Sequence, residues 1–251
     1  MLYWLLKYVL VGPFISVYNR PEVVGLENIP TDGPAILAGN HLSIADWLFT
    51  PLKSPRRITY LAKSDYFTTP GFKGRLMKMF FTGTGQTPID RSNADAAQAA
   101  LDTARRILDQ GKLVEIYVEG TRSPDGRLYK GKTGVARLTL ETGVPVIPVA
   151  VIGTDKVITE GSRLFRPAKV RVEFGAPIDF SRYQGMAGNR FVERSITDEI
   201  MYKLMQMSGQ EYVDIYGSTA KRRMQAGEPI DRLDQPRQAA DADRIPDTRA
   251  G

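Results

Sequence analysis

The segment Asn40-His41-Leu42-Ser43-Ile44-Ala45-Asp46 contains the only histidine among 251 residues, and the chain has no cysteine. Histidine is the side chain whose ordinary pKa, about 6.5, suits proton transfer near neutral pH. An acid five residues later lies about 140° away on an ideal helix. His41 and Asp46 can therefore meet only if His41 precedes a helix and Asp46 lies in its first turn, with Ser43 as the cap. Asp46 then holds one imidazole nitrogen and leaves the other free as a base.

Three further segments follow this one in the chain. They are Gly85-Gln86-Thr87-Pro88-Ile89-Asp90-Arg91, Val118-Glu119-Gly120-Thr121-Arg122-Ser123 and Val146-Ile147-Pro148-Val149. In this order, the four segments resemble the motifs of the glycerolipid acyltransferases, the family that contains 1-acyl-sn-glycerol-3-phosphate acyltransferase. The resemblance covers roughly residues 22 to 180.

The resemblance implies acyl transfer from a thioester to the free hydroxyl of 1-acylglycerol 3-phosphate (lysophosphatidic acid), which gives phosphatidic acid. His41 is then the catalytic base and Asp46 its partner. The acyl donor is either acyl-coenzyme A or an acyl-carrier protein, and no metal or other cofactor is expected. Two alternatives stay open: an enzyme acting on glycerol 3-phosphate or on another lyso-lipid or glycolipid, and a non-catalytic membrane protein that binds lipid.

The implied substrate-binding residues carry either a hydrogen-bonding group or a positive charge. They are Glu119, Gly120, Thr121, Arg122, Arg91 and Lys63. Arg122 follows a predicted strand end, where it is placed for a bidentate contact with a phosphate group. Glu119 is expected either to accept a hydrogen bond from the glycerol hydroxyl or to pair with an arginine.

The charge distribution points to a membrane surface or an anionic ligand. The net charge is +6, and residues 53 to 78 alone contain seven basic residues and one acid. These charges lie among apolar side chains, as is typical of proteins that bind anionic lipids. No recognised nucleic-acid-binding motif accompanies them, so nucleic acid is not expected as a partner. The absence of cysteine excludes disulfides, and with one histidine a zinc site is not expected.

Residues 1 to 18 are almost entirely apolar, with Lys7 as their one charged side chain. A helix of this length covers about 27 Å, which is short of the ~30 Å hydrocarbon core of a bilayer. Gly12 and Pro13 are expected to break or kink it. We therefore predict a membrane-associated helical segment embedded in one leaflet, on the cytoplasmic face of the cell membrane. A helix packed into the protein core is the alternative.

The remaining pattern predicts an α/β fold with a central, largely parallel or mixed sheet flanked by helices. Short, largely apolar runs at 35–38, 57–62, 113–118 and 144–151 and the alternating segment at 170–174 read as strands, and 71–81, 94–110, 134–141 and 191–207 read as helices. The helix at 71–81 either packs into the core or forms a wall of an acyl-chain pocket. Residues 1–20 are the helical segment, 21–216 an acyltransferase domain, and 217–251 a polar, disordered tail.

Overall fold

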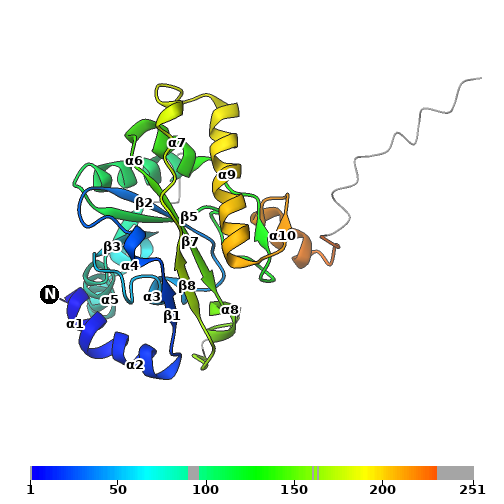
Figure 1. Ribbon diagram of the computed structural model, residues 1–251. Helices are drawn as coiled ribbons and strands as arrows, with labels where there is room; N and C mark the ends of the chain where they lie inside the picture. The colour runs from blue at the N-terminus through cyan, green and yellow to red at the C-terminus, as the bar shows by residue number, and fades with distance from the viewer. Residues whose placement is uncertain (1, 90–95, 160, 163, 231–251) are drawn as a thin grey trace, which may run out of the picture.

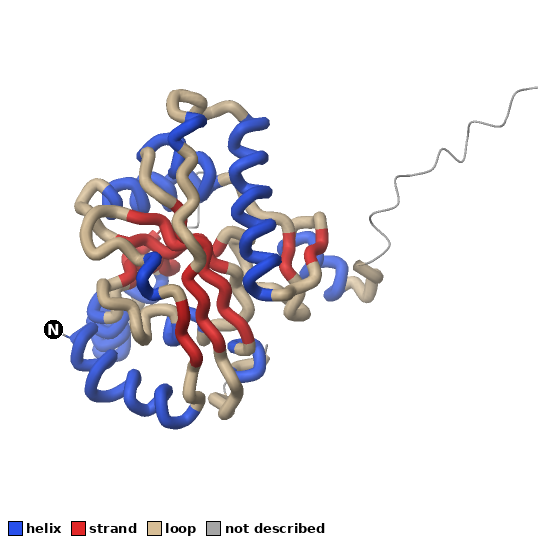
Figure 2. Tube along the Cα trace, in the orientation of Figure 1, coloured by secondary structure: helices blue, strands red, loops and turns tan. Residues whose placement is uncertain are grey.

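The computed structural model describes residues 2–89, 96–159, 161–162 and 164–230, with the side chains at 63, 65 and 66 left aside. In these residues the main sheet has seven strands in the order β1-β8-β7-β2-β5-β3-β4. Neighbouring strands run parallel except β7 and β8, which are antiparallel. Figure 1 and Figure 2 show this sheet at the centre of the molecule with helices on both sides. The prediction of an α/β fold with a largely parallel or mixed sheet is confirmed.

The strands of the main sheet are short. They are β1 (Glu22–Val24), β2 (Ala35–Gly39), β3 (Ile58–Lys63), β4 (Gln86–Ile89), β5 (Leu113–Tyr117), β7 (Val146–Ile152) and β8 (Arg171–Phe174). A separate pair, β6 (Leu128–Tyr129) and β9 (Tyr212–Val213), runs parallel. The predicted apolar runs all form strands, because a parallel strand covered on both faces is apolar along its whole length.

The described residues contain ten α-helices. They are α1 (Leu2–Leu5), α2 (Val11–Tyr18), α3 (Asp46–Phe49), α4 (Asp65–Thr68), α5 (Gly71–Gly83), α6 (Ala96–Leu108), α7 (Gly134–Thr142), α8 (Thr154–Val157), α9 (Arg190–Ser208) and α10 (Gly217–Gln225). The helices α5, α6, α7 and α9 follow the four spans predicted at 71–81, 94–110, 134–141 and 191–207, whereas α4, α8 and α10 were not predicted. A π-helical turn at Leu6–Leu10 joins α1 to α2, and short 3₁₀ turns occur at Leu26–Asn28 and Ser181–Tyr183. The predicted start of the helix at 94 lies outside the described residues.

The two faces of the sheet are covered by different helices. Ile36 and Ala38 of β2 point into a core that α6, α7 and α9 close. Leu37, the residue between them, points into a second core that contains Ile15 of α2 and Phe49 of α3. This alternation follows from the two-residue period of a strand. It places the N-terminal helices and α3 on the same side of the sheet (Figure 1).

The N-terminal segment is interrupted, as predicted, but its irregular turn precedes Gly12 and Pro13. The π-helical turn at Leu6–Leu10 comes directly before α2. Proline lacks an N–H and its ring crowds the carbonyl four residues earlier, which here is Val9 within that turn. Gly83 of α5 lets α1 lie against it, since a Cβ at Gly83 would meet Leu2 Cδ2 at 2.3 Å. The N-terminal segment and α5 therefore form one packed surface.

The C-terminal segment differs from the predicted disordered tail where it begins. Residues 217–225 form α10, and Ala220 and Ile230 are buried with Tyr129 and Val213. A few apolar side chains are sufficient here because the small β6–β9 sheet offers them a ready-made surface. Residues 231–251 lie outside the described residues, and the division of the chain into three parts stays a prediction.

Candidate active site

The candidate site lies where three neighbouring parallel strands end. His41 follows β2 by two residues, Glu119 follows β5 by two residues, and Thr154 follows β7 by two residues. Since β7, β2 and β5 are parallel neighbours, their carboxyl ends meet at one edge of the sheet. Ligand sites in α/β sheets commonly lie at this edge. The sheet thus brings together residues separated by more than one hundred positions in the sequence.

The His41 imidazole is bound directly by Asp46. His41 Nδ1 lies 2.7 Å from Asp46 Oδ2, and the side chains are 20% and 0% exposed. Asp46 is the first residue of α3, as the five-residue spacing predicted. Because Asp46 accepts from Nδ1, Nε2 is the nitrogen left to accept a proton, and it has no hydrogen-bond partner in the described part of the chain. The pair therefore has the geometry of a base with an orienting carboxylate.

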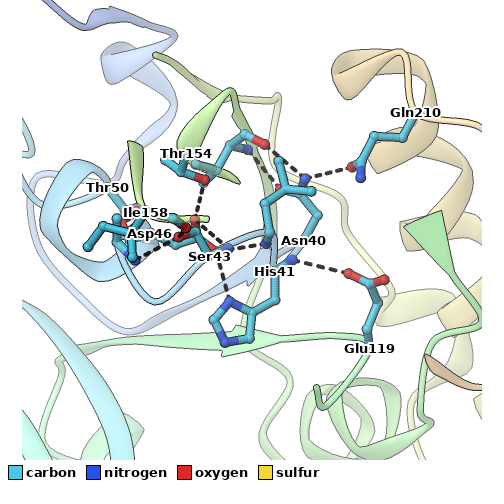
Figure 3. Close-up of polar contacts among 12 residues, drawn as sticks. Asn40, His41, Ser43, Asp46, Thr50, Glu119, Thr154, Ile158 and Gln210 are labelled. Atoms are coloured by element: carbon cyan, nitrogen blue, oxygen red, sulfur yellow. Dashed lines mark hydrogen bonds and ion pairs between the residues drawn. The ribbon is translucent and has the colours of Figure 1, made fainter. Parts of the chain in front are cut away.

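Three groups besides the imidazole hold the Asp46 carboxylate, as Figure 3 shows. Its Oδ2 accepts from the backbone N–H of Leu42 at 2.9 Å and of Ser43 at 3.0 Å, and Oδ1 accepts from Ser43 N–H at 3.2 Å and from the Thr154 hydroxyl. A buried charge is tolerable only when it is paired and hydrogen-bonded. Full satisfaction of Asp46 fixes its position and hence that of the imidazole.

The predicted cap role of Ser43 is wrong. The cap position of α3 is Ala45, with no side-chain cap bond. Ser43 Oγ donates to the Ile158 carbonyl at 2.8 Å and accepts from Ala45 N–H at 3.3 Å. Asp46 itself, at the first helical position, accepts the free N–H groups of the turn before it. A carboxylate at a helix N-terminus is favourable, so the serine is free to tie this turn to the segment after α8.

Asn40 ties the turn that carries His41 to the neighbouring strand. Its side-chain amide accepts from Val151 N–H at 2.7 Å and donates to the Val151 carbonyl at 2.9 Å. It also donates to Gln210 Oε1 at 2.7 Å, and Gln210 Nε2 donates to the Gly126 carbonyl at 2.7 Å. Figure 3 shows Gln210 on the far side of Asn40 from the imidazole. The loop after β5, the end of α9 and the turn carrying His41 are thus linked.

Glu119 is a buried support for the site. Its Oε2 accepts from His41 N–H at 3.1 Å, and Oε1 accepts from Tyr129 N–H at 2.8 Å. The side chain is 1% exposed. Burial raises the pKa of this carboxyl to about 7, although the two N–H donors oppose the shift. Both roles considered from the sequence, contact with the acceptor hydroxyl and pairing with an arginine, differ from these contacts, which are to backbone groups on either side.

The loop after Glu119 carries the other predicted binding residues. Gly120 has φ of 68°, and a Cβ there would lie 2.9 Å from Lys132 Cδ, so the glycine allows Lys132 to cross the loop. Ser123 N–H donates to the His41 carbonyl at 2.7 Å, which holds the loop beside the histidine. Thr121 and Arg122 lie between them and are half-buried. The structure therefore brings Arg122 to the same edge of the sheet as His41.

Of the two other predicted cations, Lys63 is described by its backbone alone and Arg91 is not described. Lys63 is the last residue of β3 and pairs with Ile89, so its backbone lies at the same edge of the sheet. Its side chain is not described. Arg91 lies outside the described residues, two positions after the last residue of β4. Their roles in binding stay predictions.

A buried polar cluster lies under the site on the same face of the sheet. Glu115 pairs with Tyr60 in the strand ladder, and Tyr117 follows two residues later. In the described chain, neither Glu115 oxygen has a hydrogen-bond partner, nor do the buried hydroxyls of Tyr60, Tyr117 and Tyr3. Burial raises the pKa of Glu115 to about 8. The carboxyl is therefore mainly protonated at neutral pH.

Glu115 makes folding stability depend on pH. Its pKa is about 8 in the folded chain and 4.5 as its ordinary value, so between these values the folded state holds the proton more tightly. The contribution of Glu115 to stability is therefore fully present below about pH 4.5 and falls as the pH rises, by at most about 1.4 kcal/mol per unit, until about pH 8. We expect Glu115→Gln to flatten this slope in urea unfolding at pH 5, 6.5 and 8. An unchanged slope would show that Glu115 ionises freely.

A family model described as Acyltransferase matches residues 20–152. The chain belongs to the acyltransferase family. The four segments that carry the resemblance lie within this match, which confirms the family prediction.

Two plant proteins are among its relatives. The chain is 33% identical over 168 residues to "1-acyl-sn-glycerol-3-phosphate acyltransferase BAT2, chloroplastic" of Brassica napus, which covers 65% of this chain and 47% of that protein. It is also 33% identical to "1-acyl-sn-glycerol-3-phosphate acyltransferase LPAT1, chloroplastic" of Arabidopsis thaliana, over 67% of this chain and 47% of that protein. The chain thus spans about half the length of these curated relatives.

A solved structure shares the fold. The crystal structure of the 1-acyl-sn-glycerophosphate (LPA) acyltransferase PlsC from Thermotoga maritima matches with a TM-score of 0.54 at 25% identity. The match covers 78% of this chain and 80% of the bacterial protein. The sheet and its helices are therefore those of an acyltransferase.

Proposed function

We propose that this protein transfers a fatty acyl group from an acyl thioester to the free hydroxyl of 1-acylglycerol 3-phosphate. The observation that carries the proposal is the His41–Asp46 pair, with Nδ1 bound at 2.7 Å and Nε2 free. The names of the relatives in Brassica napus, Arabidopsis thaliana and Thermotoga maritima support this acceptor. The acyl donor is acyl-coenzyme A or acyl-carrier protein.

The chemistry needs one base. His41 Nε2 removes the proton of the acceptor hydroxyl as its oxygen attacks the thioester carbonyl, so that an O–C bond forms. The C–S bond then breaks, and the imidazolium gives its proton to the leaving thiolate. A thiol has an ordinary pKa near 8.5 and leaves readily, so the protein needs no nucleophile of its own. Asp46 stabilises the imidazolium between the two proton transfers.

An acyl-transfer assay on purified full-length protein tests this function. The acceptors are 1-acylglycerol 3-phosphate, glycerol 3-phosphate and unphosphorylated monoacylglycerol, each with acyl-coenzyme A of several chain lengths. We expect turnover with the first acceptor to exceed turnover with the others. Preferred use of glycerol 3-phosphate would reassign the acceptor, and binding of lipid without turnover by any donor, including acyl-carrier protein, would contradict an enzymatic role.

Arg122 is the cation that we assign to the acceptor's phosphate. We expect Arg122→Ala to raise KM for 1-acylglycerol 3-phosphate by about tenfold to a hundredfold, because a charge-assisted hydrogen bond is lost. Turnover of monoacylglycerol should change little. Arg106→Ala, on the exposed face of α6, is the matched control. An equal loss with both acceptors would show that Arg122 supports the loop instead of the phosphate.

Membrane attachment is proposed from the surface that the N-terminal segment and α5 form. Large apolar side chains on α1, the turn after it and α2 are exposed, and so are three on α5. They are Trp4, Leu5, Tyr8, Val9, Leu10, Phe14, Val17, Tyr18, Phe72, Leu76 and Met79. An apolar patch of this kind marks an interaction site. The described helices include none of the length and hydropathy required to span a bilayer.

The one charge of the N-terminal segment is turned inward. Lys7 Nζ donates to the Ser54 carbonyl and lies 5.3 Å from the ring centroids of Trp4 and Tyr8. Burial lowers the pKa of Lys7 to about 8. The outer surface of the segment is therefore left to its apolar and aromatic side chains, which suit the interface of a bilayer. We propose that this surface lies in one leaflet, on the cytoplasmic face.

An apolar groove adjoins this surface. It is lined by the N-terminal segment, α3 and α5, including Tyr3, Leu6, Trp47, Leu48 and Phe80, and its volume is about 60 Å³. The helix α3, which begins with Asp46, therefore also lines the groove. We propose that an acyl chain bound there continues along the exposed apolar surface. These contacts favour the pocket-wall role of α5 over the core-packing alternative.

Exposed apolar residues of α2 and of the π-helical turn before it test the membrane proposal. We expect the triple change Leu10→Asp, Phe14→Asp and Val17→Asp to weaken sedimentation with anionic vesicles by at least a hundredfold, since each buried side chain contributes about 1.5–3 kcal/mol. Phe191→Asp is the control, because Phe191 is 86% exposed on α9 and lies outside this surface. Unchanged sedimentation of the triple variant would refute the proposed surface.

A further inference from the structure

The ring of Tyr117 lies flat against the imidazole of His41. The two ring centroids are 3.8 Å apart and the planes differ by 7°. The bond to Asp46 fixes one atom of the imidazole, Nδ1, but not the tilt of its plane about that bond. The stacked ring fixes the tilt. Together the two contacts fix the direction in which Nε2 points.

The strand ladder explains why the two rings can meet. Tyr117 is the last residue of β5 and pairs with Gly39, which is the last residue of β2 and stands two positions before His41. A Cβ at Gly39 would lie 3.5 Å from Tyr117 Cδ1 and 3.3 Å from Glu115 Oε1. Residue 39 therefore lies directly beside the Tyr117 ring, and the ring reaches the histidine from the neighbouring strand.

The hydroxyl of Tyr117 makes no contact that explains its presence. Tyr117 Oη is buried and has no hydrogen-bond partner among the described residues. Burial holds the pKa of this hydroxyl well above its usual range, so it stays neutral. The part of the side chain that acts on His41 is the aromatic face. Phenylalanine at this position should therefore serve as well.

We propose that Tyr117 is a positioning residue that acts through His41, a role that rests on the proposed acyl-transfer function. It keeps Nε2 aimed at the acceptor hydroxyl while the proton moves to Nε2 and on to the leaving thiolate. Its π face is also favourable for the imidazolium that exists between these two transfers, since an aromatic face attracts a cation. The stack is stronger in that state than in the neutral one, so it promotes the chemical step more than substrate binding.

Kinetics of two variants test this role. We expect Tyr117→Leu to lower kcat by about tenfold, the worth of one aromatic contact of ~1.4 kcal/mol, with KM for the acceptor within about twofold. Tyr117→Phe should restore kcat to within about twofold of the original. Tyr60→Leu is the matched control, because Tyr60 is buried on the same face of the sheet but the ring stacked on His41 is that of Tyr117. A rise in KM with unchanged kcat, or failure of phenylalanine to restore kcat, would overturn the proposal.

NMR of the imidazole separates this inference from the proposed function. His41 is the one histidine of the chain, so its ring protons give a single pair of signals without assignment ambiguity. An aromatic ring stacked above them shifts these signals upfield. We expect the shift in the original protein and in Tyr117→Phe, and its loss in Tyr117→Leu. Signals that do not change between the original and the leucine variant would refute the stack even if the protein is active. If no acyl transfer is found while the shift persists, the proposed function fails and the contact remains.

Discussion

Replacing His41 with alanine is expected to lower kcat for acyl transfer by about 10⁴-fold, the upper end of what a general base contributes. Neither of the two carboxyl groups that contact His41 in the described chain can take over. Asp46 and Glu119, the nearest carboxyl groups that contact His41, are 0% and 1% exposed, and their oxygens are engaged by N–H and O–H donors. Neither can reach a hydroxyl bound in front of the imidazole. The rate of acyl transfer under saturating acceptor and donor measures the effect.

The fold should survive this change. Within the described residues, the His41 side chain makes one hydrogen bond and one stacking contact, while the backbone contacts of residue 41 to Glu119 and Ser123 remain in the variant. We therefore expect circular dichroism and vesicle sedimentation of His41→Ala to match the original protein. Activity that survives in a folded variant would mean that His41 is structural and that the mechanism is wrong.

The second large effect is expected from Asp46→Asn, with a loss of about 10²- to 10³-fold in kcat and little change in KM. Asparagine keeps one acceptor oxygen. At the Oδ2 position this oxygen still accepts from His41 and from the N–H groups of Leu42 and Ser43, and its amide then faces the Thr154 hydroxyl, which can rotate to accept. The variant therefore keeps the imidazole orientation and loses the negative charge. What disappears is the stabilisation of the imidazolium in a water-poor site.

Thr154→Val is the matched control for this argument. It removes the hydroxyl that donates to Asp46 Oδ1 but leaves the charge and all contacts of Oδ2. We expect a loss of about tenfold or less. If Thr154→Val costs as much as Asp46→Asn, then the position of the carboxylate outweighs its charge. Steady-state kinetics of the two single variants and the double variant distinguish the two cases.

Sequence analysis predicts those parts of the site that depend on local spacing. The meeting of His41 and Asp46 follows from five residues and the geometry of one helical turn. The strands β2 and β7 are apolar along their length and β5 is apolar except for Glu115, and their parallel direction follows from the helices between them. The placement of His41 and Arg122 at one edge is a direct consequence of that direction.

Other parts depend on pairing between distant segments, and no local pattern records it. The hydroxyl of Thr154 reaches Asp46 across 108 positions, and Gln210 reaches Asn40 across 170. Thr154 has one usable signal, since it follows a strand end just as His41 does. Gln210 has none, because it lies in a polar turn after a helix.

Short strands escape sequence analysis for a different reason. β1 has three residues and β6 and β9 have two each, which is too few for an alternating pattern to appear. The small β6–β9 pair then supplies the surface on which α10 folds. Composition does not reveal this surface, and for that reason residues 217–230 look disordered when composition alone is considered.

The position of the apolar groove has a kinetic consequence. Its walls include the N-terminal segment and α5, which we propose lie in the bilayer, so we expect a lipid acceptor to enter from within the leaflet and not from bulk water. The rate is then set by the number of acceptor molecules per unit area of membrane. Adding inert phospholipid to vesicles at a fixed total amount of acceptor should slow the reaction, as two-dimensional dilution, although nothing in the aqueous phase has changed.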